Sequence, residues 1–490
     1  MRLFLIWPDK SQGVINLISA LEERGHKVVY WLGYEGSDPD APAGTIFHSY
    51  RDAILAKPAN GVGVSDFLPP SPELIAKLYK TESLILTMLN RFMDNQCVDE
   101  RRHRYYEMLR YWHGVLKKYQ PDLIIFSILP HYGYDYLLYE LAGLLGIKTL
   151  MFLDTRIPGR ILYFEDFWKG SEVLQKELSK NKDKSFSVGD LSDDIKKYYQ
   201  IFSDKNYSLL PPHIQYQKKK YSFFHGILKP SKLTAFIKDG TIFKKGFDYL
   251  SRSLKGKNFS DLFKFFVSQL SIIFKSNLKK EYINVQSVPD FSRKFVYVPL
   301  NVQPECSTSP QGDMYADQIL MIGTLSAALP GDWVIYVKEH PIQWFRFGKE
   351  FSSCRYERYY KTISEIPNVK LVPMGTNSYK LINQSQAVAT IAGAAGWEAM
   401  LRSKPALIFG YPWYKDCPSV LRVSDVESCM AALQKVANGL KIDRQDIINY
   451  LKSLEATTIR AYLADSAGQG SGLSKEESIK NITKFILSYI

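Results

Sequence analysis

The amino-acid sequence predicts an α/β protein with two lobes, separated by a segment of different composition. The chain has 490 residues, which is long for one compact domain. Before about residue 170, and again after about residue 290, short apolar runs alternate with segments of helical periodicity. This alternation is typical of parallel sheets built from right-handed β–α–β units. We therefore expect a first Rossmann-like lobe at 1–170, a helical insertion at 171–290, a second Rossmann-like lobe at 291–470 and a final helix at 471–490.

The first lobe begins with a strand–helix–strand unit. Its expected elements are a strand at 3–7, a helix at 14–21, a strand at 28–32, helices within 66–118, a strand at 121–126, a helix at 137–145 and a strand at 149–153. Gly25 and Gly146 suit positions just after a helix. No Gly-x-Gly-x-x-Gly motif follows the first strand, so a dinucleotide site is not expected there.

Polar side chains follow the later strands of this lobe. His131 lies in the loop after the strand at 121–126, and Asp154 ends the strand at 149–153. Ligands of open α/β sheets bind outside the carboxyl ends of the strands. Both residues are therefore candidates for contact with a substrate, the alternative being an ordinary polar role within a loop.

The predicted insertion carries nearly all of the net charge. Between Lys218 and Lys280 fifteen Lys or Arg stand against three acids, a surplus of twelve in a chain whose formal net charge is +13. Phenylalanines recur through the same stretch. Basic helices with an aromatic face are typical of peripheral binding to anionic lipid. Two alternatives are packing of the Phe side chains on the lobes and a nucleic-acid surface, which is disfavoured because no nucleic-acid module accompanies it.

The remaining composition favours a cytoplasmic protein. No apolar run approaches eighteen residues, so no membrane span is expected. The first residues reach Asp9 and Lys10 too soon for the apolar core of a signal peptide. The five cysteines are scattered, which predicts reduced thiols and neither disulfides nor a zinc site.

In the second lobe, three strand ends carry conspicuous polar or glycine-rich motifs. Gln303-Pro304-Glu305 lies in the loop after the strand at 294–300, and Lys338-Glu339-His340-Pro341 follows the strand at 333–337. The small-residue turn Gly393-Ala394-Ala395-Gly396 leads from a strand at 387–391 into a short helix that contains Glu398. Bare backbone amides at a helix amino end suit a phosphate. Glu398 is placed to accept the hydroxyls of a ribose, the alternative being that it only complements the helix dipole.

The order of these motifs, followed by a KPxLxFG segment with Trp and Tyr, resembles the bacterial glycosyltransferases of capsule and surface polysaccharides. That group includes transferases that use CMP-linked sugars such as Kdo, and its His-Pro motif is similar to that of bacterial sialyl- and polysialyltransferases. The resemblance covers residues 294–420. It implies a GT-B fold, in which two Rossmann-like lobes face a cleft, the second lobe holds the nucleotide sugar and the first holds the acceptor.

The resemblance also implies roles for single residues. His340 would contact the donor phosphate or a sugar carboxylate, the turn at 393–396 would meet the phosphate, and Glu398 would hold the ribose. The donor-binding candidates are Gln303, Glu305, Lys338, Glu339, His340, Pro341, Gly393, Ala394, Ala395, Gly396 and Glu398. Relatives often carry Ser or Thr in the turn where this chain has Gly393-Ala394-Ala395, so hydroxyl donors are missing here.

Transfer of a sugar also needs a group on the acceptor side. A general base or a carboxylate nucleophile is required, and Asp154, Glu165 and His131 are the candidates. No Asp-x-Asp pair lies at a strand end, so we expect a metal-independent enzyme without a cofactor other than its nucleotide-sugar donor. The expected partners are a nucleotide sugar, a polysaccharide or glycolipid acceptor and the anionic inner membrane, with no nucleic acid.

Two other functional classes remain open. A non-hydrolysing nucleotide-sugar 2-epimerase has the same two-lobe fold and a similar second-lobe turn, but it has no use for a long basic segment. A non-catalytic, membrane-associated assembly factor of a polysaccharide machine has no need for intact KEHP and GWEA motifs.

Overall fold

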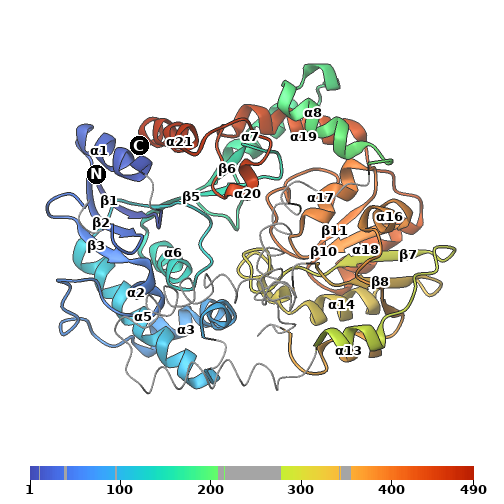
Figure 1. Ribbon diagram of the computed structural model, residues 1–490, viewed down its shortest axis with the longest axis horizontal. Helices are drawn as coiled ribbons and strands as arrows, with labels where there is room; N and C mark the ends of the chain where they lie inside the picture. The colour runs from blue at the N-terminus through green and yellow to red at the C-terminus, as the bar shows by residue number, and fades with distance from the viewer. Residues whose placement is uncertain are drawn as a thin grey trace, which may run out of the picture.

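The computed structural model contains two α/β lobes that lie side by side (Figure 1). It describes residues 1–9, 12–37, 41–93, 96–207, 215, 278–341, 343 and 355–490. The first lobe is at the left of Figure 1, the second is at the right, and helices α7, α8 and α19 run along one edge of both. The predicted fold class, two Rossmann-like lobes of the GT-B-like kind, is confirmed.

The first lobe is built on a six-stranded sheet of order β3-β2-β1-β4-β5-β6. Its strands are β1 (Arg2–Ile6), β2 (Lys27–Gly33), β3 (Ile46–Ser49), β4 (Leu123–Phe126), β5 (Lys148–Asp154) and β6 (Ile161–Phe164). All neighbouring pairs are parallel except β5 and β6, which are antiparallel. β6 therefore runs back toward the amino edge of the sheet, and the residues that follow it lie at that edge.

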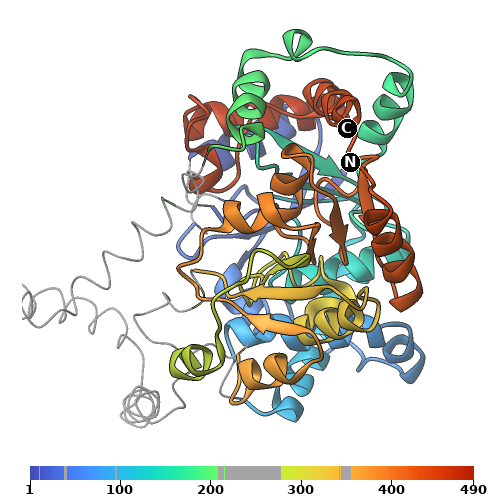
Figure 2. The ribbon, with the colours of Figure 1, turned by 90° about the vertical axis from the view of Figure 1, so that its right-hand side faces the viewer.

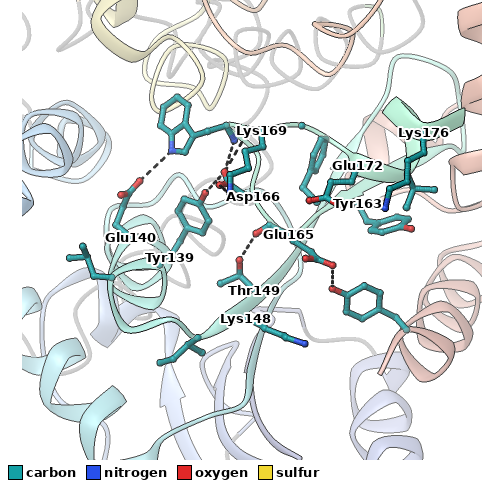
Figure 3. A pocket seen from close by; sticks show the side chains of 18 of the residues that line it. Tyr139, Glu140, Lys148, Thr149, Tyr163, Glu165, Asp166, Lys169, Glu172 and Lys176 are labelled. Carbon is teal, nitrogen blue, oxygen red and sulfur yellow. Dashed lines mark hydrogen bonds and ion pairs between the residues drawn. The ribbon is translucent and has the colours of Figure 1, made fainter. Parts of the chain in front are cut away.

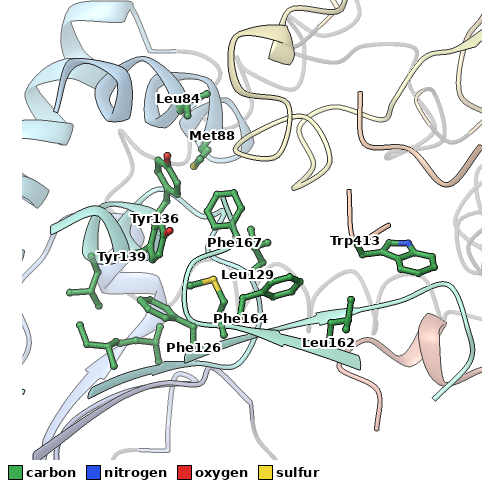
Figure 4. Close-up of a cluster of buried hydrophobic side chains, with 14 of the residues drawn as sticks. Leu84, Met88, Phe126, Leu129, Tyr136, Tyr139, Leu162, Phe164, Phe167 and Trp413 are labelled. Carbon is green, nitrogen blue, oxygen red and sulfur yellow. The ribbon is translucent and has the colours of Figure 1, made fainter. Parts of the chain in front are cut away.

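Successive side chains of each strand point to opposite faces, and both faces are covered. Leu3 and Leu5 of β1 pack in one cluster with α1 and α21, while Phe4 and Ile6 pack in another with α5 and α6. The helices of this lobe are α1 (Gln12–Glu23), α2 (Tyr50–Ile54), α3 (Pro72–Lys77), α4 (Tyr79–Met88), α5 (Val98–Tyr119) and α6 (Tyr134–Leu145), with the short helix η2 (Leu89–Arg91). Figure 4 shows the second cluster, in which Phe126, Phe164 and Phe167 lie below Leu84 and Met88 of α4, while Trp413 of the second lobe approaches from the side.

The second lobe is built on a fully parallel six-stranded sheet of order β12-β11-β10-β7-β8-β9. Its strands are β7 (Phe295–Pro299), β8 (Val334–Lys338), β9 (Val369–Leu371), β10 (Ala387–Thr390), β11 (Ala406–Ile408) and β12 (Val420–Arg422). Its helices are α13 (Leu278–Val285), α14 (Gln318–Ala327), α15 (Tyr359–Glu365), α16 (Ser378–Gln384), α17 (Ala394–Leu401) and α18 (Val426–Ala437), with the short helix η4 (Asp313–Ala316). Residues of α13, α14, α15 and α18 cover one face of the sheet, and residues of α16 and α17 cover the other.

The chain crosses between the lobes twice on the same side. On the way out it forms α7 (Glu172–Asn181), η3 (Val188–Asp190) and α8 (Asp193–Ser203). On the way back it forms α19 (Arg444–Thr457), α20 (Asp465–Gly468) and α21 (Lys475–Tyr489), and α21 packs against α1 (Figures 1 and 2). A capping box of Ser474 and Glu477 begins α21.

The segment at 171–290, expected as one helical insertion, has a first part that belongs to the folded body and a later part that lies mostly outside the described residues. Its first part folds as α7, η3 and α8, and these pack on α19 and α17 as part of the folded body. The basic stretch from Lys218 to Lys280 lies outside the described residues, apart from its last three positions at the start of α13. The predicted membrane contact and Phe-rich helices therefore remain predictions. Among the helices that the structure describes, none is both long and apolar enough to cross a membrane.

Candidate functional site

Helix α17 begins with backbone amides that no side chain caps. Gly393 is its N-cap residue, and within the described part of the chain no side chain accepts a hydrogen bond from the amides of Ala394 and Ala395. The Gly393 N–H donates to Thr390 Oγ1 (3.2 Å), which leaves the amides of Ala394 and Ala395 at the helix end, in half-buried positions. Unpaired N–H groups and the partial positive charge of a helix amino end attract phosphate. The turn predicted from the sequence is thus present as an open anion site.

The two glycines of the turn are required by packing. A Cβ atom on Gly396 would lie 2.4 Å from Tyr414 Oη, and one on Gly393 would lie 2.7 Å from Thr390 Oγ1. Tyr414 Oη donates a hydrogen bond to the Gly393 carbonyl (2.6 Å), so its ring passes directly beneath the turn. Gly396 is buried and permits this contact, whereas Ala394 and Ala395 are half-buried and Ala395 packs against the cluster that contains Tyr297 and Tyr379.

Glu398 lies one turn into α17 and is open for a ligand. Its half-buried carboxylate accepts no hydrogen bond within the described part of the chain, while its charge acts on Tyr198, Tyr297, Tyr379 and Tyr414. Burial raises the pKa of Glu398 to about 7, against the opposing effect of Arg156 and Arg402. The hydroxyl of Tyr379 is buried and has no hydrogen-bond partner among the described residues, and it lies within the electrostatic influence of Glu398.

His340 follows β8 at the same edge of the sheet. Its side chain is half-buried, and burial lowers the pKa of the imidazole to about 4, against the opposing effect of Glu339. At neutral pH it is therefore uncharged, with one ring nitrogen as a donor and the other as an acceptor. β8 ends at Lys338, and Pro341 disfavours a helical conformation of His340, so the motif leaves the sheet in an extended loop.

Arg156 brings a positive charge from the first lobe to this site. It belongs to the loop after β5, is exposed, and acts electrostatically on both Glu398 and His340. The loop is rigid because Thr155 Oγ1 donates to the carbonyls of Ile157 (3.2 Å) and Arg160 (2.8 Å). In the described part of the chain the Arg156 guanidinium makes no hydrogen bond, which leaves it available to an anionic ligand. Arg156 was not among the candidate site residues predicted from the sequence. Its position two residues after Asp154, at the carboxyl end of a strand, could have identified it.

Glu339 lies inside the second lobe and supports His340. Its carboxylate forms a fully buried ion pair with Arg355 (2.7 Å) and accepts a hydrogen bond from Tyr360 Oη (2.7 Å). It also accepts the backbone N–H of His340 (2.6 Å). Arg355 in turn donates to the Gln303 side chain and to the Asn301 carbonyl. Glu339 and Gln303 thus hold two strand-end loops together and leave ligand contact to His340.

Lys338 is also committed to the scaffold. Its ammonium group is buried and donates to the Thr376 carbonyl (2.5 Å) and to Ser378 Oγ (2.7 Å). These bonds join the end of β8 to the start of α16.

Glu305 and His131 lie where the two lobes meet. The Pro304 carbonyl accepts a hydrogen bond from Arg91 of the first lobe (3.0 Å), and the exposed Glu305 follows it. His131 Nδ1 is paired with the Leu129 carbonyl (2.7 Å), and burial together with the nearby Arg91 lowers its pKa to about 3. His131 is therefore neutral and largely enclosed, at a distance in the fold from the turn at 393–396.

The two acidic candidates of the first lobe are separated by the reversal of β6. Asp154 ends β5 at the carboxyl edge and accepts the N–H groups of Leu463 (2.9 Å) and Ala464 (3.1 Å), and burial raises its pKa to about 6. Glu165 follows β6 at the amino edge, where its carbonyl accepts from Thr149 Oγ1 (2.5 Å). Asp154 pairs with Ile161 at the start of β6 and Glu165 follows the last residue of β6, so the two acids are about 13 Å apart along the strands. The structure thus brings together His340, Glu398, the turn and Arg156, with Asp154 nearby, and leaves Glu165 apart.

No group of three or more His, Cys, Asp or Glu side chains suited to a metal ion occurs within the described residues.

Part of the second lobe matches a known family. Residues 284–417 match the family described as "Capsule polysaccharide biosynthesis protein", so the resemblance predicted from the strand-end motifs is confirmed over this segment. No curated protein matches the chain.

Several solved structures are similar at low identity. The β-Kdo 2,7 transferase KpsC of Thermosulfurimonas dismutans is 11% identical with a TM-score of 0.34, over 77% of this chain and 89% of that one. The UDP-GlcNAc 2-epimerase of Neisseria meningitidis, bound to UDP-GlcNAc, is 9% identical with a TM-score of 0.25, over 100% and 99% of the two chains. The calicheamicin glycosyltransferase CalG4 is 11% identical with a TM-score of 0.24, over 100% and 98%. Similarity at this level says nothing about the activity of this chain.

Proposed function

We propose that the protein is a glycosyltransferase that moves a sugar from a nucleotide-sugar donor to a surface polysaccharide or glycolipid acceptor at the inner face of the membrane. The match of residues 284–417 to the capsule polysaccharide family supports the substrate class. A CMP-linked donor is favoured by the resemblance of the His-Pro and GWEA motifs. The basic stretch between Lys218 and Lys280 supports the membrane location.

One arrangement carries this proposal: the uncapped amino end of α17, with Glu398 and His340 beside it and Arg156 opposite, on the other lobe. The donor phosphate binds the amides of Ala394 and Ala395, and the ribose hydroxyls donate to Glu398. His340 donates to a phosphate oxygen or to a carboxylate of the sugar. Each group matches one part of a nucleotide sugar.

The chemistry places negative charge where these groups can stabilise it. The bond between the anomeric carbon and the phosphate oxygen breaks, and the acceptor oxygen bonds to the same carbon. The charge that develops on the leaving nucleotide is stabilised by the helix amides, by His340 and by Arg156. Fixed donors and charges of this kind can stabilise the leaving nucleotide without a metal ion.

The acceptor hydroxyl must lose its proton during transfer. Asp154 is the best placed of the three candidates for this role, because it lies at the carboxyl edge beside Arg156 and its pKa is about 6. His131 is enclosed at the lobe contact, and Glu165 lies at the opposite edge of the sheet.

Donor turnover tests the proposal. CMP-linked and UDP-linked sugars are incubated with the full chain, with and without a lipid-linked oligosaccharide acceptor, and free nucleotide and sugar products are measured. A glycosyltransferase releases nucleotide faster when the acceptor is present. Formation of the 2-epimer of the donor without any acceptor would instead identify an epimerase. Absence of turnover with either donor class would favour an assembly factor.

A further inference from the structure

A separate cavity lies in the first lobe, at the amino edge of its sheet. Its volume is about 500 Å³. Side chains of α6, of the β5–β6 pair and of the start of α7 face it (Figure 3). Tyr489 of α21 also lines it and donates a hydrogen bond to Glu165 (2.5 Å). Lys148, which begins β5, lines the cavity, whereas Arg156 follows the other end of the same strand. The part of the cavity at Lys148 is therefore about 20 Å from Asp154, which precedes the loop that faces the donor site, and the cavity extends along the strand pair as far as Tyr163, opposite Phe152.

The walls of this cavity combine both signs of charge with hydroxyl groups. Four acidic and four lysine side chains line it, among them Glu140, Asp166, Lys148 and Lys176. Equal numbers of each sign give no net field that would select a phosphate or another strongly charged ligand. The walls also contain apolar surface, but a purely hydrocarbon ligand would leave their charged side chains without partners. A polyhydroxylated ligand suits them, because each sugar hydroxyl both donates and accepts hydrogen bonds.

The acidic groups are held in place before any ligand binds. Asp166 Oδ1 accepts hydrogen bonds from Tyr139 Oη (2.9 Å) and from the Trp168 backbone N–H (2.9 Å). Glu140 Oε1 accepts from Trp168 Nε1 (3.4 Å), and burial raises the pKa of Glu140. A half-buried carboxylate is costly unless it receives further donors, which sugar hydroxyls supply.

The loop that forms one wall also contacts the second lobe. Lys415 Nζ donates to the Lys169 carbonyl (2.9 Å), and Gln175 Nε2 donates to Lys169 O (2.9 Å) and to Asp416 (3.2 Å). A ligand in the cavity therefore touches the same loop that joins the lobes. It would lie in the first lobe, against the loop that the second lobe holds through Lys415, without entering the donor site.

We propose that this cavity is a non-catalytic binding site for a saccharide unit of the glycan that the enzyme extends. The inference rests on the proposed function for the identity of the glycan. The distance from the donor site means that the bound unit lies several residues along the glycan from the hydroxyl that reacts. Binding there would keep a long acceptor attached between transfers.

Glycan binding by the full chain tests this proposal. The wild type is applied to an array of bacterial capsule and lipopolysaccharide oligosaccharides, and retained glycans are titrated. The cavity variant combines Glu140→Gln with Lys176→Met. The matched control combines Glu177→Gln with Lys180→Met, an acid and a lysine of α7 that pair with each other outside the cavity (3.2 Å). The variant His340→Ala reports on the donor site.

The expected result is retention of at least one glycan by the wild type, the matched control and His340→Ala, with affinity reduced about tenfold or more in the cavity variant. Hydrolysis of the donor in water should be the same in the cavity variant as in the wild type. The proposal is overturned if no glycan is retained, if the cavity variant binds as the wild type does, or if the array binds only when His340 is intact. Retention of glycans without any donor turnover would refute the proposed function and leave this site standing.

Discussion

Glu398 provides the sharpest test of the donor site, because it accepts no hydrogen bond in the described part of the chain. We expect Glu398→Gln to weaken the binding of CMP while keeping the fold. Two ribose hydroxyls donating to a carboxylate are replaced by weaker bonds to a neutral amide. The loss is about 2–3 kcal/mol, since bonds to charged groups contribute roughly 1–1.5 kcal/mol more than neutral ones. This corresponds to a rise in Kd of about 30- to 150-fold.

The pH dependence of CMP binding provides a second quantitative test of Glu398. With a pKa of about 7, the ionised fraction of Glu398 falls from about nine-tenths at pH 8 to about one-tenth at pH 6. Binding that needs the carboxylate should therefore weaken about tenfold over this range. The Gln variant should show only the change that comes from titration of the nucleotide phosphate, so the difference between the two proteins isolates Glu398.

The stability of the unliganded protein should change with pH in the opposite direction to the affinity for CMP. The folded-state pKa of Glu398 is raised, so its neutral form favours the native state at acid pH, and this contribution is lost as the pH rises through 7. The Glu398→Gln variant has no ionisable group at this position, so it does not lose stability in this way as the pH rises. The variant should be more stable than the wild type at pH 8, by at most about 3 kcal/mol, and nearly equal to it at pH 5. Thermal unfolding at both pH values measures this difference.

Isothermal titration with CMP and with 2′-deoxy-CMP completes the test. Removal of the 2′-hydroxyl should cost the wild type affinity and should cost the Gln variant much less. Equal losses in the two proteins, or an unchanged Kd for CMP in Glu398→Gln, would refute ribose binding by Glu398 and leave only an effect on the helix dipole.

Four further predictions concern the other groups. His340→Ala should reduce transfer by about a hundredfold or more with an unchanged unfolding temperature, because one preorganised donor is lost, and near-normal kcat would remove His340 from the mechanism. Arg156→Gln should weaken CMP binding about ten- to a hundredfold without affecting cytidine, and Arg156→Lys should recover part of it; equal losses for CMP and cytidine would argue against phosphate contact. Asp154→Asn should lower kcat by at least about a hundredfold with an unchanged Kd for CMP, and it should abolish a pH–rate inflection near 6; survival of that inflection would point to another base. Replacement of five lysines of the basic stretch by Gln should release the protein from anionic vesicles at low salt, since each lysine contributes on the order of 1 kcal/mol of binding free energy. If the wild type does not bind such vesicles, the membrane hypothesis is wrong. The five lysines are Lys218, Lys219, Lys220, Lys244 and Lys245.

The sequence was sufficient for most of the strands but not for both edges of the first sheet. Apolar runs such as 121–126 and 387–391 appear as β4 and β10 within a few residues of the expected bounds. The edge strands β3 and β6 were not predicted, because the polar residues His48 and Ser49 interrupt the first, and the second follows β5 after only a short turn. Pro158-Gly159, between β5 and β6, was nevertheless a recognisable turn signal, and Gly159 has a φ of +68°. Reading it as a hairpin would have moved Glu165 to the amino edge.

Site residues were predictable from the sequence where they directly follow the carboxyl end of a strand. The turn at 393–396, Glu398 and His340 lie together because parallel strands place their loops at one edge. Glu339 and Lys338 belong to the same motif, yet their side chains turn inward to Arg355 and Ser378, partners that no local pattern identifies. The contact of Arg156 with the second lobe depends on how the lobes are joined, which is a property of the whole chain.

Arg160 sets the way in which the two lobes can move. Its guanidinium donates to Asp194 of the outgoing helix α8 (2.7 Å) and to Thr458 Oγ1 of the returning segment (3.1 Å), so both crossings are fastened to one point. Two linkers tied together act as a single pivot and permit rotation more readily than sliding. A rotation of the lobes about this point would separate Lys80 from Asp313 (2.8 Å), which join the two lobes on the far side of the molecule. Arg156 lies four residues from Arg160, so the same rotation would displace Arg156 much less than Lys80.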